Sequence, residues 1–469
     1  MNKKITLAVF FIIALTTGKL YAISTDSLEQ NTKLILEAYI LKGNKHTRDA
    51  VIMRELQVKP GEKVSVYELP LFLENVYSRL MNSSLFNDVQ IKDSIAGNQL
   101  YIICDLRERW FIYPLPVLNQ GGLNVGSWLS GKNFHMMNYG LRLVHYNFRG
   151  RKEYLELKAV GGFSREFSID YEIPAINKKR TLGLNIAAAF AANNKVNASS
   201  DNCKLQSIQL KRNIVWKQYY SLGLVWRPGI FTSHNLTFSF DYASVSDTVF
   251  AANPHYFTNK KKSMGYFSLN YFLKLDKRDW YAYPKKGYLW ELSLTQTGLG
   301  IEPVNSLNMF RASTLFYYYQ PIAGRFYAAA GISVLFSASP SQPYSMQSAL
   351  GYDEYVRGYE PYVIPGQHYS VLKTNLRYGL LKRKVFRLKK IKWNEINTIP
   401  LALYLGMHCD AAYVSDSKQF FNNPLANRVR AGYGFGLDVV TIYSIVFRFE
   451  YSFTEKGNNG FFFSIGKAF

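Results

Sequence analysis

The chain has 469 residues, 16% of them aromatic, and a formal net charge of +23. Its mean hydropathy is only −0.12. Past the amino terminus it contains no apolar run of about 18 residues, so no membrane-spanning helix is predicted. The cysteines Cys104, Cys203 and Cys409 are far apart and odd in number, which gives neither a metal-ligand spacing nor a disulfide framework. The 35 tyrosines and 32 phenylalanines suit a membrane β-barrel with aromatic girdles.

The positive charge is concentrated in the carboxyl-terminal part of the chain. Residues 23–110 hold 11 Lys plus Arg against 12 Asp plus Glu, so the excess lies in residues 111–469. Nucleic-acid binding is one interpretation of such a balance. An exported chain of alternating strands argues against it, and no nucleic-acid partner is expected. A basic lumen, or basic loops facing anionic lipid headgroups, explains the charge with fewer assumptions.

Residues 1–22 are predicted to be a secretory signal peptide. Lys3 and Lys4 precede the apolar stretch 5–15, and small and polar residues lead to a cleavage site after Ala22. The mature chain is therefore expected to be exported.

Residues 34–109 are predicted to form a small α+β domain of order β-α-α-β-β. Thr47 is expected to be the N-cap of the first helix, and the second helix places its apolar residues on one side. An Ala-Gly-Asn turn separates the last two strands. The predicted elements are strands at 35–41, 89–91 and 100–106 and helices at 48–56 and 68–81.

Residues 111–469 alternate between apolar and polar side chains in segment after segment. One such segment sets Leu372, Leu376, Tyr378 and Leu380 against Lys373, Asn375 and Arg377. A Lys or Arg facing lipid at mid-depth costs about 2 to 4 kcal/mol, so the apolar set should face lipid and the charged set the lumen. Strands of about 10 residues predict a membrane all-β fold, with a 16-stranded antiparallel transmembrane β-barrel after the small α+β domain.

Four short motifs stand out in the barrel region. The first is Asn147-Phe148-Arg149-Gly150, and the second comprises Asp276, Arg278, Asp279, Pro284 and Gly287. The third, Val356-Arg357-Gly358-Tyr359, lies in a connection of residues 337–367, and loops this long in a compact fold are usually functional. The fourth is the final alternating strand, with Phe463, Ile465, Gly466 and Phe469.

In this order the motifs resemble those of the superfamily of BamA and TamA outer-membrane assembly factors and two-partner-secretion transporters. The amino-terminal domain resembles its POTRA module. The resemblance implies that the Val-Arg-Gly-Tyr loop folds back into the lumen, where Arg357 contacts Asp410 in a strand similar to the family's "F-x-D-x-G" pattern. Ala412 replaces the glycine of that pattern, and Lys152 stands where a glycine is common.

The same resemblance assigns roles to the two remaining motifs. Residues 276–287 are expected to form a tight periplasmic turn shaped by Pro284 and Gly287. The last strand resembles the signal by which such barrels are themselves inserted. A barrel also has a physical reason to end on an apolar strand, because closure leaves no open edge in lipid.

The expected function is insertion or translocation of polypeptide clients at the bacterial outer membrane without nucleotide energy. The POTRA domain is expected in the periplasm. Unfolded or nascent outer-membrane or secreted polypeptides would bind through the POTRA sheet edge and the barrel seam. Outer-membrane lipids and accessory lipoproteins are the other expected partners, and no cofactor or metal is expected. A single POTRA domain suggests a specialised member.

Two other functional classes are alternatives to this expectation. A passive pore for anions or small solutes would need a lumen that the long loop leaves open. An enzyme is not expected, because the chain has no Gly-x-Ser-x-Gly elbow and its seven histidines show no metal-ligand spacing. His408, beside Asp410, is interpreted as a wall residue rather than a catalytic base.

Overall fold

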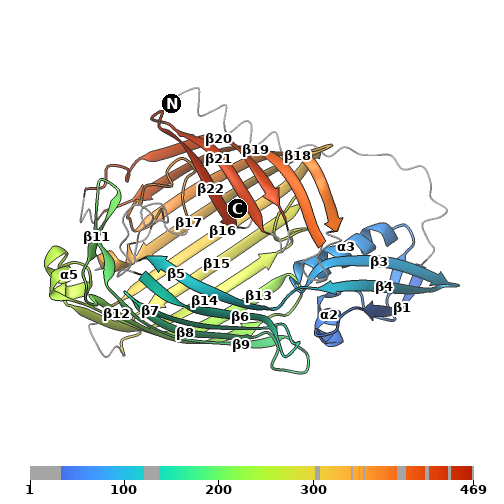
Figure 1. The fold of residues 1–469 in the computed structure, drawn as a ribbon. Coiled ribbons are helices and arrows are strands. Elements are labelled where there is room, and N and C mark those ends of the chain that lie inside the picture. Colours follow the sequence, from blue (N-terminus) through green and yellow to red (C-terminus); the bar gives the residue numbers. More distant parts are fainter. Residues whose placement is uncertain are drawn as a thin grey trace.

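The computed structural model describes residues 33–120, 137–301, 307–339, 342–347, 349–351, 354–387, 398–417, 422–441 and 445–466. They form a small α+β domain followed by a large antiparallel barrel (Figure 1). No helix in the described ranges is long and apolar enough to cross a membrane.

The N-terminal domain is a four-stranded sheet with two helices. Its elements are β1 (Lys33–Lys42), α2 (Asp49–Glu55), β2 (Lys63–Ser65), α3 (Leu69–Asn82), β3 (Phe86–Ala96) and β4 (Gln99–Glu108). The strand order is β2-β1-β4-β3, and only β1 and β4 are parallel. Helix and sheet residues bury one apolar core, in which Leu36, Ile52, Leu80 and Leu100 are at most 1% exposed.

The predicted order β-α-α-β-β was wrong in one respect, because β2 lies between the helices. Its three residues pair with the start of β1, where Leu34 lies opposite Val64. Three residues are too few to show the alternation that identifies a strand. Thr47 does not cap α2 either: the N-cap position is Arg48, without a side-chain cap. The Thr47 hydroxyl instead accepts a hydrogen bond from Asn147 Nδ2 at 2.9 Å.

Over the described residues the barrel is one sheet of 16 strands, which confirms the predicted fold and strand count. Each strand is antiparallel to its neighbours, and the sheet runs in chain order with β9 directly beside β12. The strands are β5 (Ile112–Gln120), β6 (Met137–Phe148), β7 (Glu153–Gly162), β8 (Arg165–Ile173), β9 (Leu182–Asn193), β12 (Val215–Trp226), β13 (Thr232–Val245), β14 (Ser263–Asp276), β15 (Gly287–Thr297), β16 (Met309–Ala323), β17 (Phe326–Ala338), β18 (His368–Arg387), β19 (Thr398–Ser415), β20 (Val429–Val440), β21 (Val446–Thr454) and β22 (Asn459–Gly466).

The two faces of the wall differ as the alternation predicts. On β18, Leu372 and Leu376 are 40% and 41% exposed on the outside, whereas Lys373 and Arg377 are 9% and 2% exposed. The outer face is therefore apolar, and the charged side chains are packed inside the barrel.

Between β9 and β12 the chain leaves the wall and forms a separate hairpin, β10 (Lys195–Asp201) and β11 (Lys204–Gln209). The hairpin lies at the end of the barrel opposite the N-terminal domain, near the short helix α5 (Asp247–Ala252) (Figure 1). We call this end the far end and the other the domain end. Two short 3₁₀ turns are also present, η2 (Thr258–Lys260) and η3 (Tyr344–Met346).

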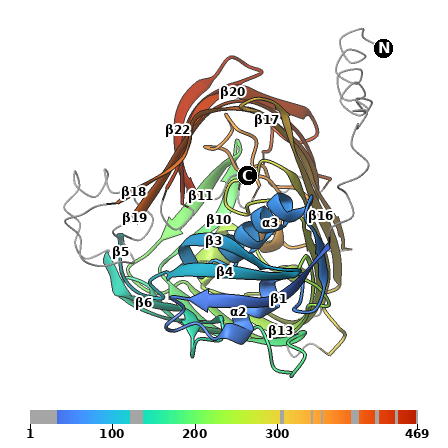
Figure 2. The same ribbon diagram turned by 90° about the vertical axis from the view of Figure 1, so that its right-hand side faces the viewer.

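The sheet has two edges, β5 and β22, which lie on the same side of the barrel (Figure 1). On β22, Phe463 and Ile465 are 51% and 60% exposed on the outer face. Phe469 lies outside the described residues. Seen from the domain end, the N-terminal domain lies in front of the barrel opening (Figure 2).

Candidate functional site

The connection between β17 and β18 brings the Val-Arg-Gly-Tyr residues into the barrel. An isolated bridge between Leu350 and Ile364 closes the base of this inward loop. Val356, Arg357 and Tyr359 are 2%, 3% and 4% exposed, so the motif is packed against the wall rather than presented to solvent.

Arg357 makes a bidentate ion pair with Asp410 on β19. Its Nε lies 2.8 Å from Asp410 Oδ2 and its Nη2 lies 2.5 Å from Oδ1. The Arg357 backbone N–H also donates to Oδ2 at 3.2 Å. Asp410 is 1% exposed, and a paired fork of this kind fixes direction as well as charge. The structure thus brings together the two residues that the sequence analysis paired.

A second carboxylate, Glu450 on β21, is one that sequence reasoning missed. Its Oε1 accepts a hydrogen bond from Arg357 Nη1 at 3.5 Å. The carbonyl of Thr374 on β18 accepts from Nη2 at 3.1 Å. Glu450 belongs to the polar face of an alternating strand, and that inward position was the only available signal.

Two glycines allow the backbones to approach one another. Gly358 has φ +95°, a left-handed conformation that side chains disfavour. Gly432 on β20 lies so close to the loop that an added Cβ atom would stand 1.8 Å from the Arg357 carbonyl oxygen. The loop is therefore fitted to strands β18 to β21 through backbone as well as charge.

Two further contacts hold the flanks of the motif. The Tyr359 hydroxyl donates to Glu455, the residue that follows β21. Lys373 Nζ donates to Glu354 Oε2 at 2.8 Å. The inward loop is thus attached on both sides of Arg357.

The connection between β14 and β15 also folds inward, so the prediction of a tight turn there was wrong. Asp276 and Arg278 form a bidentate pair, at 2.8 and 2.6 Å. Asp279 Oδ1 accepts the backbone N–H of Lys285 at 2.9 Å. Gly287 has φ +101°, and an added Cβ would lie 2.1 Å from a backbone oxygen.

The middle of this connection reaches the wall that holds the loop. The Tyr283 hydroxyl donates to Asp438 Oδ2 on β20 at 2.8 Å. Asp438 Oδ1 accepts from Arg448 Nε at 2.9 Å, and Arg448 Nε lies 4.0 Å from Glu450 Oε1. Buried polar contacts therefore run from Tyr283 to Arg357. The Pro284 carbonyl accepts from Arg377 at 3.4 Å.

A family model described as the Omp85 superfamily domain matches residues 147–469. The chain belongs to the Omp85 superfamily. The sequence-based resemblance is thus confirmed, and so are the outer-membrane location and the β-barrel class. A search of curated protein sequences found no match.

The structure is similar to that of BamA from Haemophilus ducreyi lacking POTRA domains 1-3, with a TM-score of 0.51 and 15% identity over 93% of this chain and 85% of that one. It is also similar to CdiB from Escherichia coli, with a TM-score of 0.48 and 11% identity over 97% and 93% of the two chains. At these identities the likeness concerns the fold.

The N-terminal domain is attached to this Omp85 barrel by a buried charge cluster. Glu55 on α2 accepts hydrogen bonds from Arg227 Nη1 and Nη2 at 3.0 and 2.8 Å and from Lys152 Nζ at 3.1 Å. Burial acts to raise the pKa of Glu55, but the Lys152 ammonium and the Arg227 guanidinium outweigh it and hold the pKa well below its ordinary value. The carboxylate is therefore charged when the domain is docked.

The turn after β6 supplies another part of the docking surface. Asn147 is fully buried, and its carbonyl lies 2.9 Å from His46 Nε2. Gly150 has φ +69°, and an added Cβ would stand 2.2 Å from the His46 carbonyl oxygen. The Asn-Phe-Arg-Gly motif, whose role the sequence left open, thus contacts the N-terminal domain.

Helix α3 contacts the inward connection between β14 and β15. Asn82 Nδ2 donates to the Asp279 carbonyl at 2.9 Å, and Asn82 Oδ1 accepts from the Tyr281 N–H at 2.9 Å. One asparagine therefore links the N-terminal domain to the segment that carries Tyr283.

Ser452, His408 and Glu450 form in space the series of hydroxyl, imidazole and carboxylate that is found in serine hydrolases. His408 Nε2 is 3.1 Å from Ser452 Oγ, and His408 Nδ1 is 3.7 Å from Glu450 Oε1. Ser452 is 0% exposed, so its hydroxyl cannot reach a substrate. Within the described part of the chain, no group of three or more His, Cys, Asp or Glu side chains could hold a metal ion.

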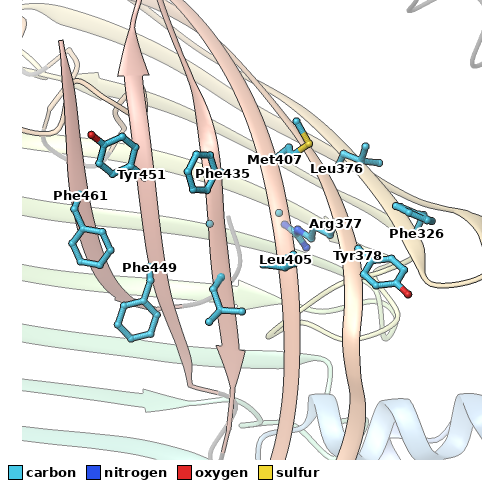
Figure 3. A pocket seen from close by; sticks show the side chains of 13 residues that line it. Phe326, Leu376, Arg377, Tyr378, Leu405, Met407, Phe435, Phe449, Tyr451 and Phe461 are labelled. Carbon is cyan, nitrogen blue, oxygen red and sulfur yellow. The ribbon is translucent and has the colours of Figure 1, made fainter. Parts of the chain in front are cut away.

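The outer wall carries a shallow apolar groove across β17 to β22, with a volume of about 750 Å³. Figure 3 shows aromatic and aliphatic side chains around it, among them Met407, Phe435, Phe449 and Phe461. The groove ends at the β22 edge. Lipid acyl chains are the natural occupants of such a surface in a membrane.

Proposed function

We propose that the protein inserts polypeptide clients into the outer membrane or translocates them across it, without nucleotide. The observation that carries the proposal is an Omp85 barrel that combines two sheet edges with an anchored inward loop. Of the described residues, none of β5 pairs with any of β22. Unpaired edge groups in lipid are costly, and a client strand that supplies their hydrogen bonds would be drawn to them.

The N-terminal domain would lie in the periplasm and receive clients first. It has the element content of a POTRA domain, and β3 is the edge of its sheet. The second half of β3, from Lys92 to Ala96, is exposed along its whole length. An extended client could add to this edge as a further strand. Accessory lipoproteins would bind the same domain.

A passive pore is the second candidate, supported by the net positive charge of the barrel region. The contacts at the far end of the barrel argue against a passive pore. The Cys203 carbonyl accepts from the Val363 N–H at 2.9 Å, and the Cys203 thiol donates to Asn423 Oδ1 at 3.0 Å. The hairpin therefore rests on the inward loop and on the connection after β19, which obstructs a solute path.

Reconstitution would test the proposal directly. The full chain is placed in liposomes, and a urea-unfolded outer-membrane barrel is added as client. Protease-resistant, membrane-integrated client should accumulate without nucleotide, and the Asp410→Asn variant should reduce it. Client that remains protease-sensitive, together with steady ion conductance through the same liposomes, would favour the pore.

A further inference from the structure

The two edges of the barrel sheet differ in their hydrogen-bonding capacity. In an antiparallel pair, residues that bond to the partner alternate with residues whose N–H and C=O point away from it. At the start of β5 the Tyr146 N–H donates to the Phe111 carbonyl at 2.9 Å, in register with the pairing of β5 and β6. The even-numbered residues of β5 therefore direct their backbone groups to the open edge.

Two of these even-numbered residues are prolines. Pro114 and Pro116 occupy two successive positions of β5 whose backbone groups point to the open edge. Proline has no backbone N–H, so the middle of this edge can accept hydrogen bonds but cannot donate them. Prolines in sheets are confined to such positions, where they also blunt an edge against pairing.

The open edge of β22 has all of its backbone donors and acceptors. The Thr454 N–H donates to the Asn458 carbonyl at 2.8 Å, in register with the pairing of β21 and β22. The odd-numbered residues of β22 therefore face the open edge. They are Asn459, Phe461, Phe463 and Ile465, and each carries both a donor and an acceptor.

We propose that β22 is the edge on which an extended client strand docks, and that Pro114 and Pro116 keep β5 from competing for it. The inference rests on the proposed function and adds to it which side of the seam binds. The partner is an extended polypeptide with alternating apolar side chains, because Phe461, Phe463 and Ile465 are 64%, 51% and 60% exposed on the lipid face. Their rings would pack beside the client's apolar residues.

Disulfide trapping in nanodiscs tests the proposal. Cys409 is exposed and is first replaced by serine, whereas Cys104 and Cys203 are buried. A single cysteine is then placed on β22 by Phe463→Cys or on β5 by Leu115→Cys. The probe is a synthetic peptide of about nine alternating residues with one cysteine, trapped under a mild oxidant.

We expect trapping on β22 to exceed trapping on β5 by about tenfold, the ratio that two backbone hydrogen bonds can supply. The pair Pro114→Ala and Pro116→Ala restores both donors and should bring the ratio close to one. Pro321→Ala, at a bulge in β16, is the matched control and should leave the ratio unchanged. Equal trapping at both edges of the protein with its native prolines would overturn the proposal.

An N-methylated peptide keeps the test valid if the proline variants do not fold. Methylation of all backbone nitrogens of the peptide removes the donors on both of its edges but keeps the apolar side chains, so trapping on β22 should fall to background. Unchanged trapping would mean apolar adhesion and would overturn the proposal, as would disulfide-linked dimers of the Phe463→Cys variant that exclude the peptide. Preferential trapping without client insertion in liposomes would instead contradict the proposed function alone.

Discussion

The carbonyl oxygen of Arg357 lies 1.8 Å from the place where a Cβ atom would stand on Gly432. No side chain can occupy that position unless the loop or the strand moves. The inward loop is therefore held by shape at β20 and by charge at β19 and β21. This double attachment makes the loop's position testable with single substitutions.

Gly432→Ala should push the loop away from the wall. Overpacking of a tight site costs about 1 to 3 kcal/mol, and the displaced Arg357 would lose part of its bond to Asp410. Limited proteolysis at the loop should become faster. Gly161→Ala, whose added Cβ would find only a ring atom at 4.0 Å, is the control and should cleave at the native rate.

Asp410→Asn should destabilise the barrel more than a typical wall substitution. It leaves the buried Arg357 with Glu450 as its remaining carboxylate, and the loss of one partner of a buried pair costs about 3 to 5 kcal/mol. The temperature at which the folded barrel is lost on semi-native gels should fall. The melting temperature of an Arg357→Lys variant should lie between those of the native protein and of Asp410→Asn, because lysine keeps the charge without the bidentate fork. A melting temperature equal to the native one would contradict the assigned role of the pair.

Tyr283→Phe should loosen the inward loop from a distance. It removes only the hydroxyl that donates to Asp438 and keeps the ring, which stacks on Tyr404 with centroids 4.3 Å apart. A spin-label pair between loop and wall should show a broader distance distribution. Tyr404→Phe removes a hydroxyl from the same stack without touching Asp438. If both variants broaden the distribution equally, the effect belongs to the stack and not to the polar contacts.

Lys152→Met should weaken docking of the N-terminal domain. It keeps most of the apolar stem but leaves Glu55, among the described residues, with Arg227 as its remaining ion-pair partner, at an expected cost of about 1 to 3 kcal/mol. Lys152→Gly loses the same charge but relieves the left-handed φ of +61°, a gain of about 1 kcal/mol. Protection of the domain from protease should fall in both variants, and more in the methionine variant.

The contribution of Glu55 to docking should be constant from about pH 8 to about pH 5 and be lost only in strong acid. A carboxyl whose pKa is lowered on folding contributes fully above its ordinary pKa, and the contribution is lost as the pH falls through the folded value. The pKa of Glu55 is lowered from the ordinary value of 4.5. Domain mobility measured by spin labels against pH would check this. In Glu55→Gln the acid transition should disappear.

The alternation of apolar and polar residues was sufficient to predict the barrel, because a charge on the lipid-facing side of any strand costs free energy. Alternation gave no prediction for β10 and β11, which form a separate hairpin whose Cys203 is buried against the inward loop. Such a hairpin alternates like a wall strand, so periodicity cannot tell the two apart. At β2 the strand was too short for any period to appear.

The loop motif and its partner were predictable because Arg357 and Asp410 carry unlike charges in motifs of known order. Glu450 and Gly432 were not, since neither has a local pattern and both depend on which strands lie under the loop. Tyr283 was missed for a similar reason: it stands inside a motif, but its partner Asp438 lies 155 residues away. Register across the barrel, rather than residue type, decides these contacts.

The docking contacts limit how freely this molecule can be recombined. Lys152, Arg227 and Asp279 lie in three different turns of the barrel, and each meets the N-terminal domain at a specific atom. A domain borrowed from another family member would meet turns built for a different partner. The domain and these barrel turns therefore fit one another as a unit, and a working chimera has to exchange them together.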